Sequence, residues 1–113
     1  MLDKPKSSST KPSVCLIGCF EFGAQILTSL IEADKYDVNV VTITKEQADI
    51  YEVSNFFDYT DIIATNSLKF YVPSTYSLKS AEDIKHFSEC NFDILVIGGW
   101  NRLIPENILK TIK

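Results

Sequence analysis

The feature that most constrains this chain is the alternation of short apolar runs with stretches of helical spacing. Residues 14–18, 37–44, 69–72 and 92–99 are short and rich in β-branched and other apolar side chains, which is typical of strands covered on both faces. Strands that alternate with helices are joined by right-handed crossovers. The sequence therefore predicts an α/β fold, a Rossmann-like parallel sheet of about four strands flanked by helices.

Four stretches carry helical signals. Ser80 stands three residues before Asp83, which is a capping-box-like start, and Pro105 suits the first position of a last helix. Residues 58–65 predict a short helix that ends at Asn66. The apolar residues expected on one face of the other three helices are Phe22, Ile26, Leu27, Leu30 and Ile31, then Ala81, Ile84 and Phe87, and finally Ile108, Leu109 and Ile112.

Composition narrows the class of protein. Residues 1–12 hold lysine, serine and proline with little to bury, so we expect a disordered tail before a domain over residues 13–113. The net charge of -4 provides no basic footprint, and no nucleic acid partner is expected. No apolar run approaches the roughly 20 residues of a membrane helix, and no signal peptide is apparent, so the chain is expected to be cytoplasmic.

The cysteines and the histidine suggest no metal site. Cys15, Cys19 and Cys90 form no CxxC pair, and Cys15 is expected to be a small core residue. His86 is the single histidine and lies in a predicted helix, where we expect it to face solvent. A catalytic triad is not available, and no residue is assigned to catalysis.

Both glycine-containing turns fall at carboxyl ends of predicted strands, where ligands of parallel sheets bind. The first turn, GCFEFG at residues 18–23, is neither the dinucleotide fingerprint nor a P-loop. It can serve simply as a tight turn between a strand and a helix. Phe56, Phe57 and Tyr59 are expected to be core and lid aromatics, since no basic residues interleave with them.

The second turn is the more informative. Gly98 and Gly99 leave the backbone bare, so either another part of the protein or a ligand comes close to it. Trp100, Asn101 and Arg102 then offer apolar contact and hydrogen-bond donors together, as in many small-molecule pockets. The alternative is that Trp100 packs under the last helix while Arg102 meets a carboxylate.

Three stretches carry a resemblance to a known family: VCLIGCFEFGAQIL, SNFFDYTDIIATNSLKFYVP and DILVIGGWNRLIPENIL. Together they resemble the N-terminal part of the formyltransferases, which transfer a formyl group from N10-formyltetrahydrofolate to an amine. The likeness covers roughly residues 13–113, which it identifies as a partial formyltransferase N-terminal, folate-binding domain. The last stretch is similar to the family's fourth strand and the loop that cradles the folate ring.

The resemblance implies both a cofactor site and a missing catalytic set. It assigns the folate-type cofactor N10-formyltetrahydrofolate to the backbone and side chains of Gly99, Trp100, Asn101, Arg102, Leu103 and Ile104. The family's catalytic asparagine and histidine lie on the next strand, in an N-x-H-P-S-type motif, with an aspartate later. The sequence ends at Lys113 before any of them, so we expect a truncated chain that is inactive alone, since each lost oxyanion donor costs about 3 kcal/mol.

The resemblance leaves the amine substrate open. A nucleotide-linked amino sugar is the first choice, because the loop pairs tryptophan with proline and the chain is acidic, and methionyl-tRNA is the second. The alternative is a non-catalytic folate-binding or self-associating interaction module. In that case a homodimer is expected to form through the uncovered edge of the fourth strand.

Overall fold

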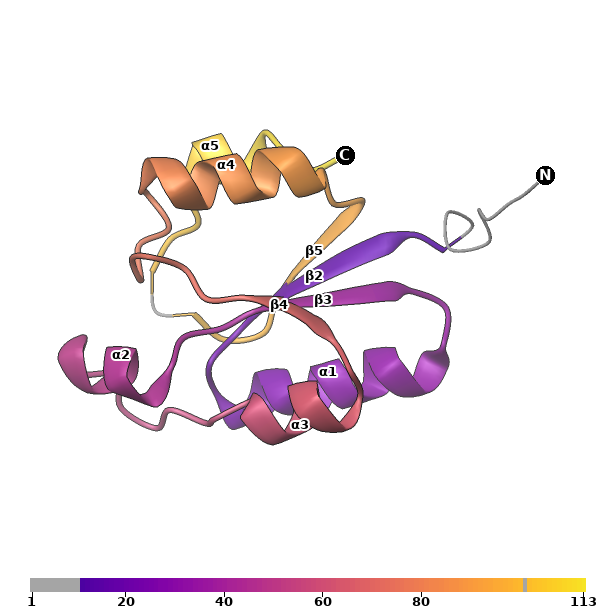
Figure 1. Ribbon diagram of the computed structural model, residues 1–113, viewed down its shortest axis with the longest axis horizontal. Coiled ribbons are helices and arrows are strands. Elements are labelled where there is room, and N and C mark those ends of the chain that lie inside the picture. Colours follow the sequence, from indigo (N-terminus) through magenta and orange to yellow (C-terminus); the bar gives the residue numbers. More distant parts are fainter. Residues whose placement is uncertain (1–10, 101) are drawn as a thin grey trace.

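The computed structural model describes residues 11–100 and 102–113 and confirms the predicted α/β fold. Its sheet has four parallel strands: β2 (Ser13–Ile17), β3 (Asp37–Val41), β4 (Lys69–Tyr71) and β5 (Ile94–Ile97). The order is β4-β3-β2-β5, so the first strand of the described residues, β2, lies inside the sheet and the last, β5, lies at its edge (Figure 1). The carboxyl ends of β2 and β5 are therefore neighbours.

Helices cover both faces of the sheet. The helices α1 (Glu21–Ala33) and α3 (Thr60–Thr65) lie on one face, and α4 (Ala81–Cys90) and α5 (Glu106–Leu109) lie on the other (Figure 1). A further helix, α2 (Lys45–Ile50), is present that the sequence pattern did not predict, and β3 ends at Val41, three residues before the predicted end at Thr44. Thr44 is instead the N-cap of α2, where its hydroxyl and the Gln47 side chain form a reciprocal capping box.

The two sides of the strands supply two halves of the core. Leu16, Val38 and Val40 face α1 and α3, while Cys15 and Ile17 face α4 and α5, as the two-residue period of a strand requires. Cys15 is fully buried, which confirms its predicted place in the core and raises the pKa of its thiol. On the second face the buried partners of the sheet include Leu78, Phe87, Phe92 and Ile108.

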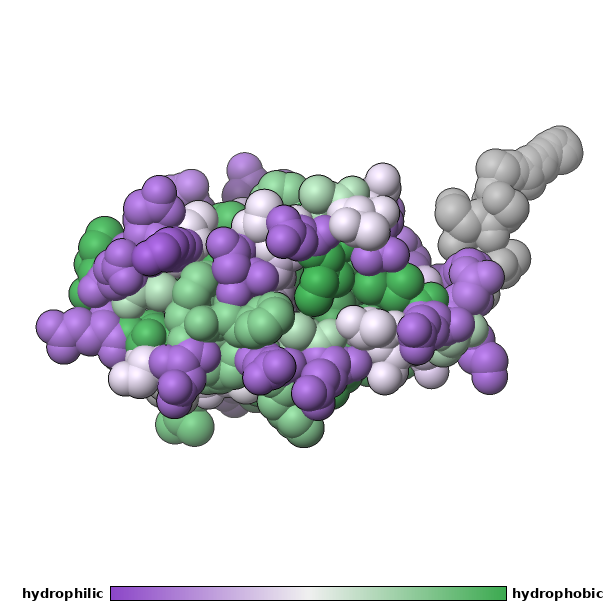
Figure 2. All heavy atoms as spheres, turned by 90° about the horizontal axis from the view of Figure 1, so that it is seen from below, coloured by the Kyte–Doolittle hydropathy of each residue, from purple (hydrophilic) through white to green (hydrophobic). Residues whose placement is uncertain are grey.

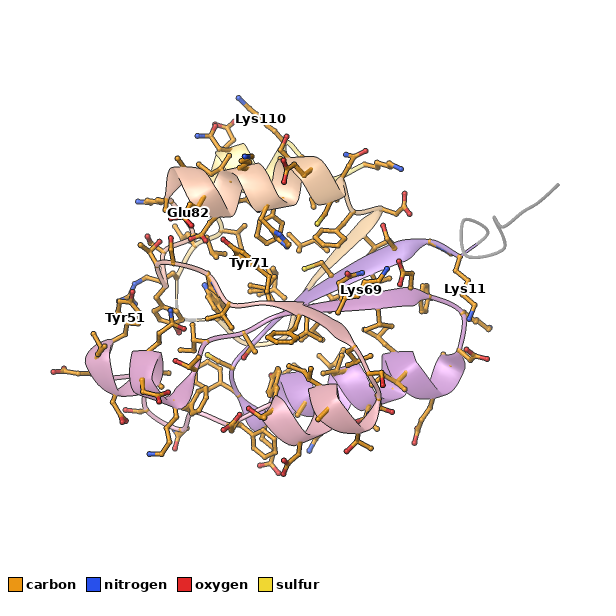
Figure 3. The ribbon with its side chains drawn as sticks, in the orientation of Figure 1. Lys11, Tyr51, Lys69, Tyr71, Glu82 and Lys110 are labelled. Carbon is orange, nitrogen blue, oxygen red and sulfur yellow. The ribbon has the colours of Figure 1, made fainter. Side chains whose placement is uncertain are left out.

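Two predicted orientations were wrong. Phe22 is 65% exposed, because the next residues, Gly23 and Ala24, are the ones that α1 buries, while Phe22 lines a surface hollow together with residues 54–57. His86 is half-buried, because its ring stacks on Tyr71 of β4, with centroids 3.8 Å apart and planes within 7°. Tyr71 lies between the sheet and α4 (Figure 3), and burial lowers the pKa of His86.

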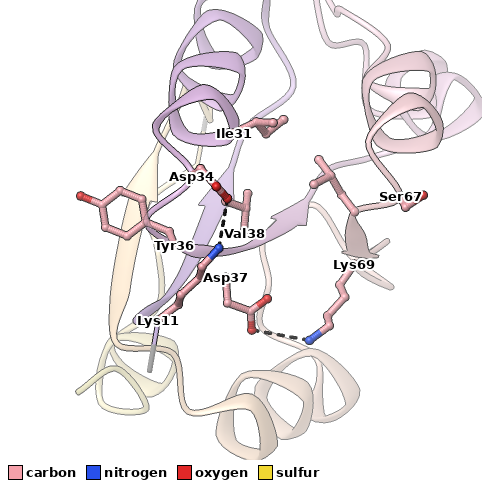
Figure 4. Close-up of a pocket in the computed structure, with 9 residues that line it drawn as sticks. Lys11, Ile31, Asp34, Tyr36, Asp37, Val38, Ser67 and Lys69 are labelled. Atoms are coloured by element: carbon pink, nitrogen blue, oxygen red, sulfur yellow. Dashed lines mark hydrogen bonds and ion pairs between the residues drawn. The ribbon is translucent and has the colours of Figure 1, made fainter. Parts of the chain in front are cut away.

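Of the predicted tail, residues 1–10 lie outside the described part of the chain. The structure does describe Lys11 and Pro12, and the Pro12 carbonyl accepts a hydrogen bond from Asp37 N–H at 2.9 Å. Lys11 pairs with Asp34 and Lys69 with Asp37, at 3.0 and 3.5 Å, around a cavity near the amino ends of the strands (Figure 4). Among the described helices, none has the length and apolar character to cross a membrane.

The outer edge of β5 is open among the described residues. Ile94 and Ile97 are 40% and 44% exposed, although both belong to an apolar strand. After α5 the chain returns to the other end of this strand, where the Lys113 N–H donates to the Phe92 carbonyl at 2.9 Å. The residue at the end of the sequence thus lies beside the amino end of the open edge.

A glycine junction and an aromatic cluster at the candidate site

The two glycine turns predicted from the sequence pack directly against each other. Gly98 N–H donates to the Ile17 carbonyl at 2.7 Å, and Cys19 N–H donates to the Gly99 carbonyl at 3.2 Å. A Cβ atom added to Gly98 would lie 2.9 Å from the Cα of Gly23, which is closer than real Cβ contacts. The turn after β2 and the turn after β5 can therefore meet only because Gly23 and Gly98, the residues in contact, both lack a side chain.

Gly99 has a separate requirement for glycine. Its φ is +102°, a backbone conformation that residues with side chains rarely adopt. A Cβ there would lie 2.7 Å from Cδ2 of Phe20 in the first turn. The bare backbone that the sequence analysis singled out is thus approached by another part of the protein, which was one of the two alternatives it considered.

Tyr59 completes this junction. Its side chain is fully buried, and its hydroxyl donates to the Phe20 carbonyl at 2.6 Å, beside Gly18 and Gly23. Burial raises the pKa of Tyr59, so the phenol is neutral at physiological pH. Its predicted role as a core aromatic is confirmed, whereas Phe57 is 36% exposed and Phe56 is half-buried.

Tyr76, which sequence reasoning missed, is the centre of an aromatic cluster at the same edge of the sheet. Trp100 donates its indole N–H to the Tyr76 carbonyl at 3.0 Å, and the two rings lie 4.7 Å apart. The guanidinium carbon of Arg102 lies 5.0 Å from the centre of the Tyr76 ring. The ring of Tyr51 stacks on the Tyr76 ring, with their centres 5.6 Å apart. The signal available in the sequence was a single aromatic residue inside the polar loop PSTYSLKS.

Five of the six residues predicted to bind the cofactor are described by the structure, and they have different surroundings. Trp100 and Arg102 gather around Tyr76, and Trp100 also packs on the core cluster that includes Ile108 of the last helix, α5. Ile104 packs on the core, while Leu103 is 93% exposed. Gly99 belongs to the junction described above, and Asn101 lies outside the described residues.

The chemistry of this edge favours binding over acid–base catalysis. Cys19 is fully buried with its sulfur 3.8 Å from the Tyr76 hydroxyl, and burial raises the pKa of its thiol. The groups around it are backbone amides, aromatic rings and a neutral phenol. Such a surface can pair with the edge of a flat molecule and support its faces, but it offers no poised general base.

Fold and site together define an α/β protein whose candidate site lies at the carboxyl ends of β2 and β5. No family model matches the sequence. The chain is 26% identical over 102 residues to a methionyl-tRNA formyltransferase of Pediococcus pentosaceus. The aligned part covers 89% of this chain but only 31% of that relative, so the chain spans about a third of its length. This distant similarity supports a relationship to the formyltransferase family.

Proposed function

We propose that this chain is the N-terminal part of an N10-formyltetrahydrofolate-dependent formyltransferase. The observation that carries the proposal is the similarity to a methionyl-tRNA formyltransferase across 89% of the chain. The parallel sheet adds support, because residues 99–104 follow β5 at the edge where ligands of such folds bind. The loop over residues 99–104 would then form one side of the folate site.

The described residues of this loop suit a folate ring. The loop begins where the Gly99 carbonyl is held by Cys19 N–H, and it ends at Pro105, whose carbonyl accepts hydrogen bonds from Ile108 and Leu109. Between these fixed points Leu103 presents an apolar side chain that is 93% exposed. A heterocycle can rest on that side chain while its polar edge pairs with main-chain groups. The bound folate would supply the formyl group.

The catalytic groups would come from outside the described residues. His86 is the single histidine of the sequence, and its ring on α4 is stacked against Tyr71. The family resemblance assigns the catalytic asparagine and histidine to the strand after β5. The exposed side chains of Ile94 and Ile97 support a position for that strand along the open edge.

Methionyl-tRNA is the acceptor that the comparison favours. The relative is a methionyl-tRNA formyltransferase, whereas the preference for a nucleotide-linked amino sugar rests on the Trp100 and Pro105 pairing and on the net charge of -4. Because the relative is about three times as long as the aligned part, we assign any tRNA contacts to residues beyond those compared. Both acceptors belong in the assay.

The folate site is tested by calorimetry of the 113-residue chain with tetrahydrofolate. We expect binding that is weakened at least tenfold by Leu103→Asp, which places a charge under the ring. Leu109→Asp is the matched control, because Leu109 is also an exposed leucine (50%) but lies on α5. Absence of binding at millimolar tetrahydrofolate, or equal losses in the two variants, would count against a folate site in this loop.

The missing catalytic set is tested by assaying formyl transfer from N10-formyltetrahydrofolate to methionyl-tRNA and to amino sugars. We expect the 113-residue chain to show no turnover above the enzyme-free rate, because its described residues offer no oxyanion site. A version extended through any N-x-H-P-S segment encoded after Lys113 should be active. Turnover by the short chain, from a preparation verified by mass spectrometry, would contradict the assignment.

A second candidate function is a self-associating module, and the open edge of β5 favours it. An apolar edge strand with Ile94 and Ile97 exposed can pair with the same edge of a second copy. Sedimentation velocity distinguishes the two candidates. A dimer that Ile97→Pro dissociates, with no folate binding in the wild type, would favour this module over the formyltransferase fragment, because the N–H of Gly98 bonds to β2 and that of Ile97 points to the open edge.

A further inference from the structure

A cavity of about 610 Å³ lies at the carboxyl ends of β3 and β4, on the face that α3 covers. It shares no lining residue with the loop over residues 99–104, so it is separate from the proposed folate site. Figure 2 views the molecule from the side of α1 and α3, where hydrophobic side chains gather among polar ones. The residues that matter most to the cavity are Thr42, Lys45, Asp58, Ile63, Phe70 and Val72.

The wall of this cavity is apolar and partly uncovered. Phe70 pairs in register with Val40, which faces α1 and α3, so its ring projects from that face of the sheet. It is nevertheless 59% exposed, because α3 has only six residues. Ile63 of α3 flanks the same space. An aromatic ring and a branched aliphatic chain lining one cavity provide the surroundings that a flat ring prefers.

Thr42 supplies a buried polar group beside this apolar wall. The residue is 5% exposed, and its hydroxyl has no hydrogen-bond partner among the described residues, although its backbone N–H donates to the Tyr71 carbonyl at 3.3 Å. Buried hydroxyls are nearly always paired, so an unpaired one calls for a partner. Rotation about the Cα–Cβ bond exchanges the hydroxyl with the methyl group, which lets a molecule in the cavity reach it.

The mouth of the cavity carries net negative charge. Two carboxylates, Glu46 and Asp58, stand against the single ammonium of Lys45, which leaves a formal charge of -1. Asp58 accepts from the hydroxyl and the N–H of Thr60 at 2.5 and 2.9 Å, and these bonds hold the pKa of its carboxyl below the usual value. The Lys45 ammonium also lowers the pKa of Asp58, and with both carboxylates ionised the lining keeps its net negative charge, which favours a cation.

We propose that this cavity binds a small aromatic amine, with a neutral hydroxyl at its inner end and an ammonium group at its outer end. The hydroxyl would pair with Thr42, since an inner charge would be desolvated. The ring would lie between Phe70 and Ile63, and the ammonium would remain at the mouth near Glu46 and Asp58. The proposal does not depend on formyl transfer, because no group of the folate loop takes part.

The experiment uses tyramine as the probe, with the 113-residue chain followed by amide NMR shifts. We expect a dissociation constant on the order of 1 mM, which suits a fragment-sized ligand. Phenethylamine, which lacks the hydroxyl, should bind at least threefold more weakly. The carboxylate analogue 3-(4-hydroxyphenyl)propionate should not bind. Equal binding of all three, or no shift near Thr42 and Phe70 at saturating tyramine, would overturn the proposal.

Two variants connect the binding to the cavity. Ala64→Phe fills the space from α3 and should weaken tyramine at least tenfold, whereas Thr65→Phe, on the neighbouring residue outside the cavity lining, should not. Thr42→Val keeps the shape of the side chain but removes the unpaired hydroxyl, so it should abolish the preference for tyramine over phenethylamine while raising the melting temperature. A preference that survives Thr42→Val would show that the hydroxyl plays no part.

Discussion

The loops that follow β4 and β5 lie at the same edge of the sheet but are held in different ways. The loop over residues 73–80 is held by Asp83 of α4. The buried carboxylate of Asp83 accepts hydrogen bonds from the backbone N–H groups of Ser74 and Thr75 at 2.9 and 3.3 Å, and it also accepts one from the hydroxyl of Tyr71, the last residue of β4, at 2.6 Å. In the described part of residues 99–104, the turn is held at its ends and Leu103 remains 93% exposed. A loop whose backbone groups are occupied by its own protein is structural, while one that leaves an apolar side chain outside has room for a ligand.

The largest effect is expected at the base of the second loop, from Gly23→Ala. The added Cβ would overlap the Gly98 carbonyl and the Tyr59 hydroxyl, and the carbonyl belongs to the backbone, so β5 would have to move away from α1. We expect the free energy of unfolding to fall by about 4 kcal/mol, near the upper end for single substitutions. Urea unfolding measures it. The matched control is Ala33→Gly at the exposed last residue of α1, where we expect a loss of about 1 kcal/mol or less.

A retained fold with less than 1 kcal/mol lost in Gly23→Ala would contradict the close packing of the two turns. It would mean that the backbone around Gly23 and Gly98 can move to accept a side chain. The base of the loop after β5 would then not be fixed, as the comparison of the two loops assumes.

The next effect is expected in the first loop, from Asp83→Asn. The amide keeps the shape of the carboxylate but brings two hydrogens toward groups that already donate, including the Tyr71 hydroxyl and Ser74 N–H. We expect a loss of about 2 to 3 kcal/mol, because buried donors lose their acceptor. Asp61→Asn, on the exposed first turn of α3, should change stability by less than about 0.5 kcal/mol. Equal effects of the two substitutions would show that Asp83 does not hold the loop.

The same carboxylate predicts a pH dependence. Burial by itself would raise the pKa of Asp83, but its hydrogen bonds from Tyr71, Ser74 and Thr75 outweigh burial and lower it. Since the folded pKa is below the unfolded value of about 3.9, ionised Asp83 stabilises the fold above that pH and the contribution is lost as pH falls through the folded pKa. The stability difference between wild type and Asp83→Asn should therefore shrink below about pH 4. A difference that stays constant from pH 7 to pH 3 would contradict this role.

The smallest effect on stability is expected from Leu103→Ser in the second loop. Because the leucine is 93% exposed, its removal should change the free energy of unfolding by less than about 0.5 kcal/mol. The comparison of the loops is sharpened if this variant keeps the melting temperature of wild type and binds tetrahydrofolate more weakly. A clear loss of stability would show that Leu103 packs in solution, and the loop would then be structural like the first.

The parallel sheet could be predicted because local pattern and burial agree along each strand. The apolar runs at residues 14–18 and 92–99 are too continuous for a sheet with one face exposed to solvent. All four predicted strands are present in the structure. The helix α2 was missed because Ala48 is its buried residue and forms no apolar stripe, although its Thr44 to Gln47 capping box was visible in the sequence. Phe22 and His86 were misplaced because helical spacing shows which residues share a face but not where the neighbouring elements end.

By itself the sequence determined the fold class, the places of the two glycine turns and the loop that resembles a folate site, because these depend on short-range pattern. Only the tertiary structure decided which part of the protein each glycine contacts. Gly98 meets Gly23 although the two lie 75 positions apart in the chain, and such a close approach depends on strand order, which no local pattern specifies. The same holds for Tyr76, whose cluster with Trp100 and Arg102 forms where separate loops reach one edge of the sheet. Loop residues meet there because the strands that carry them are parallel and end together.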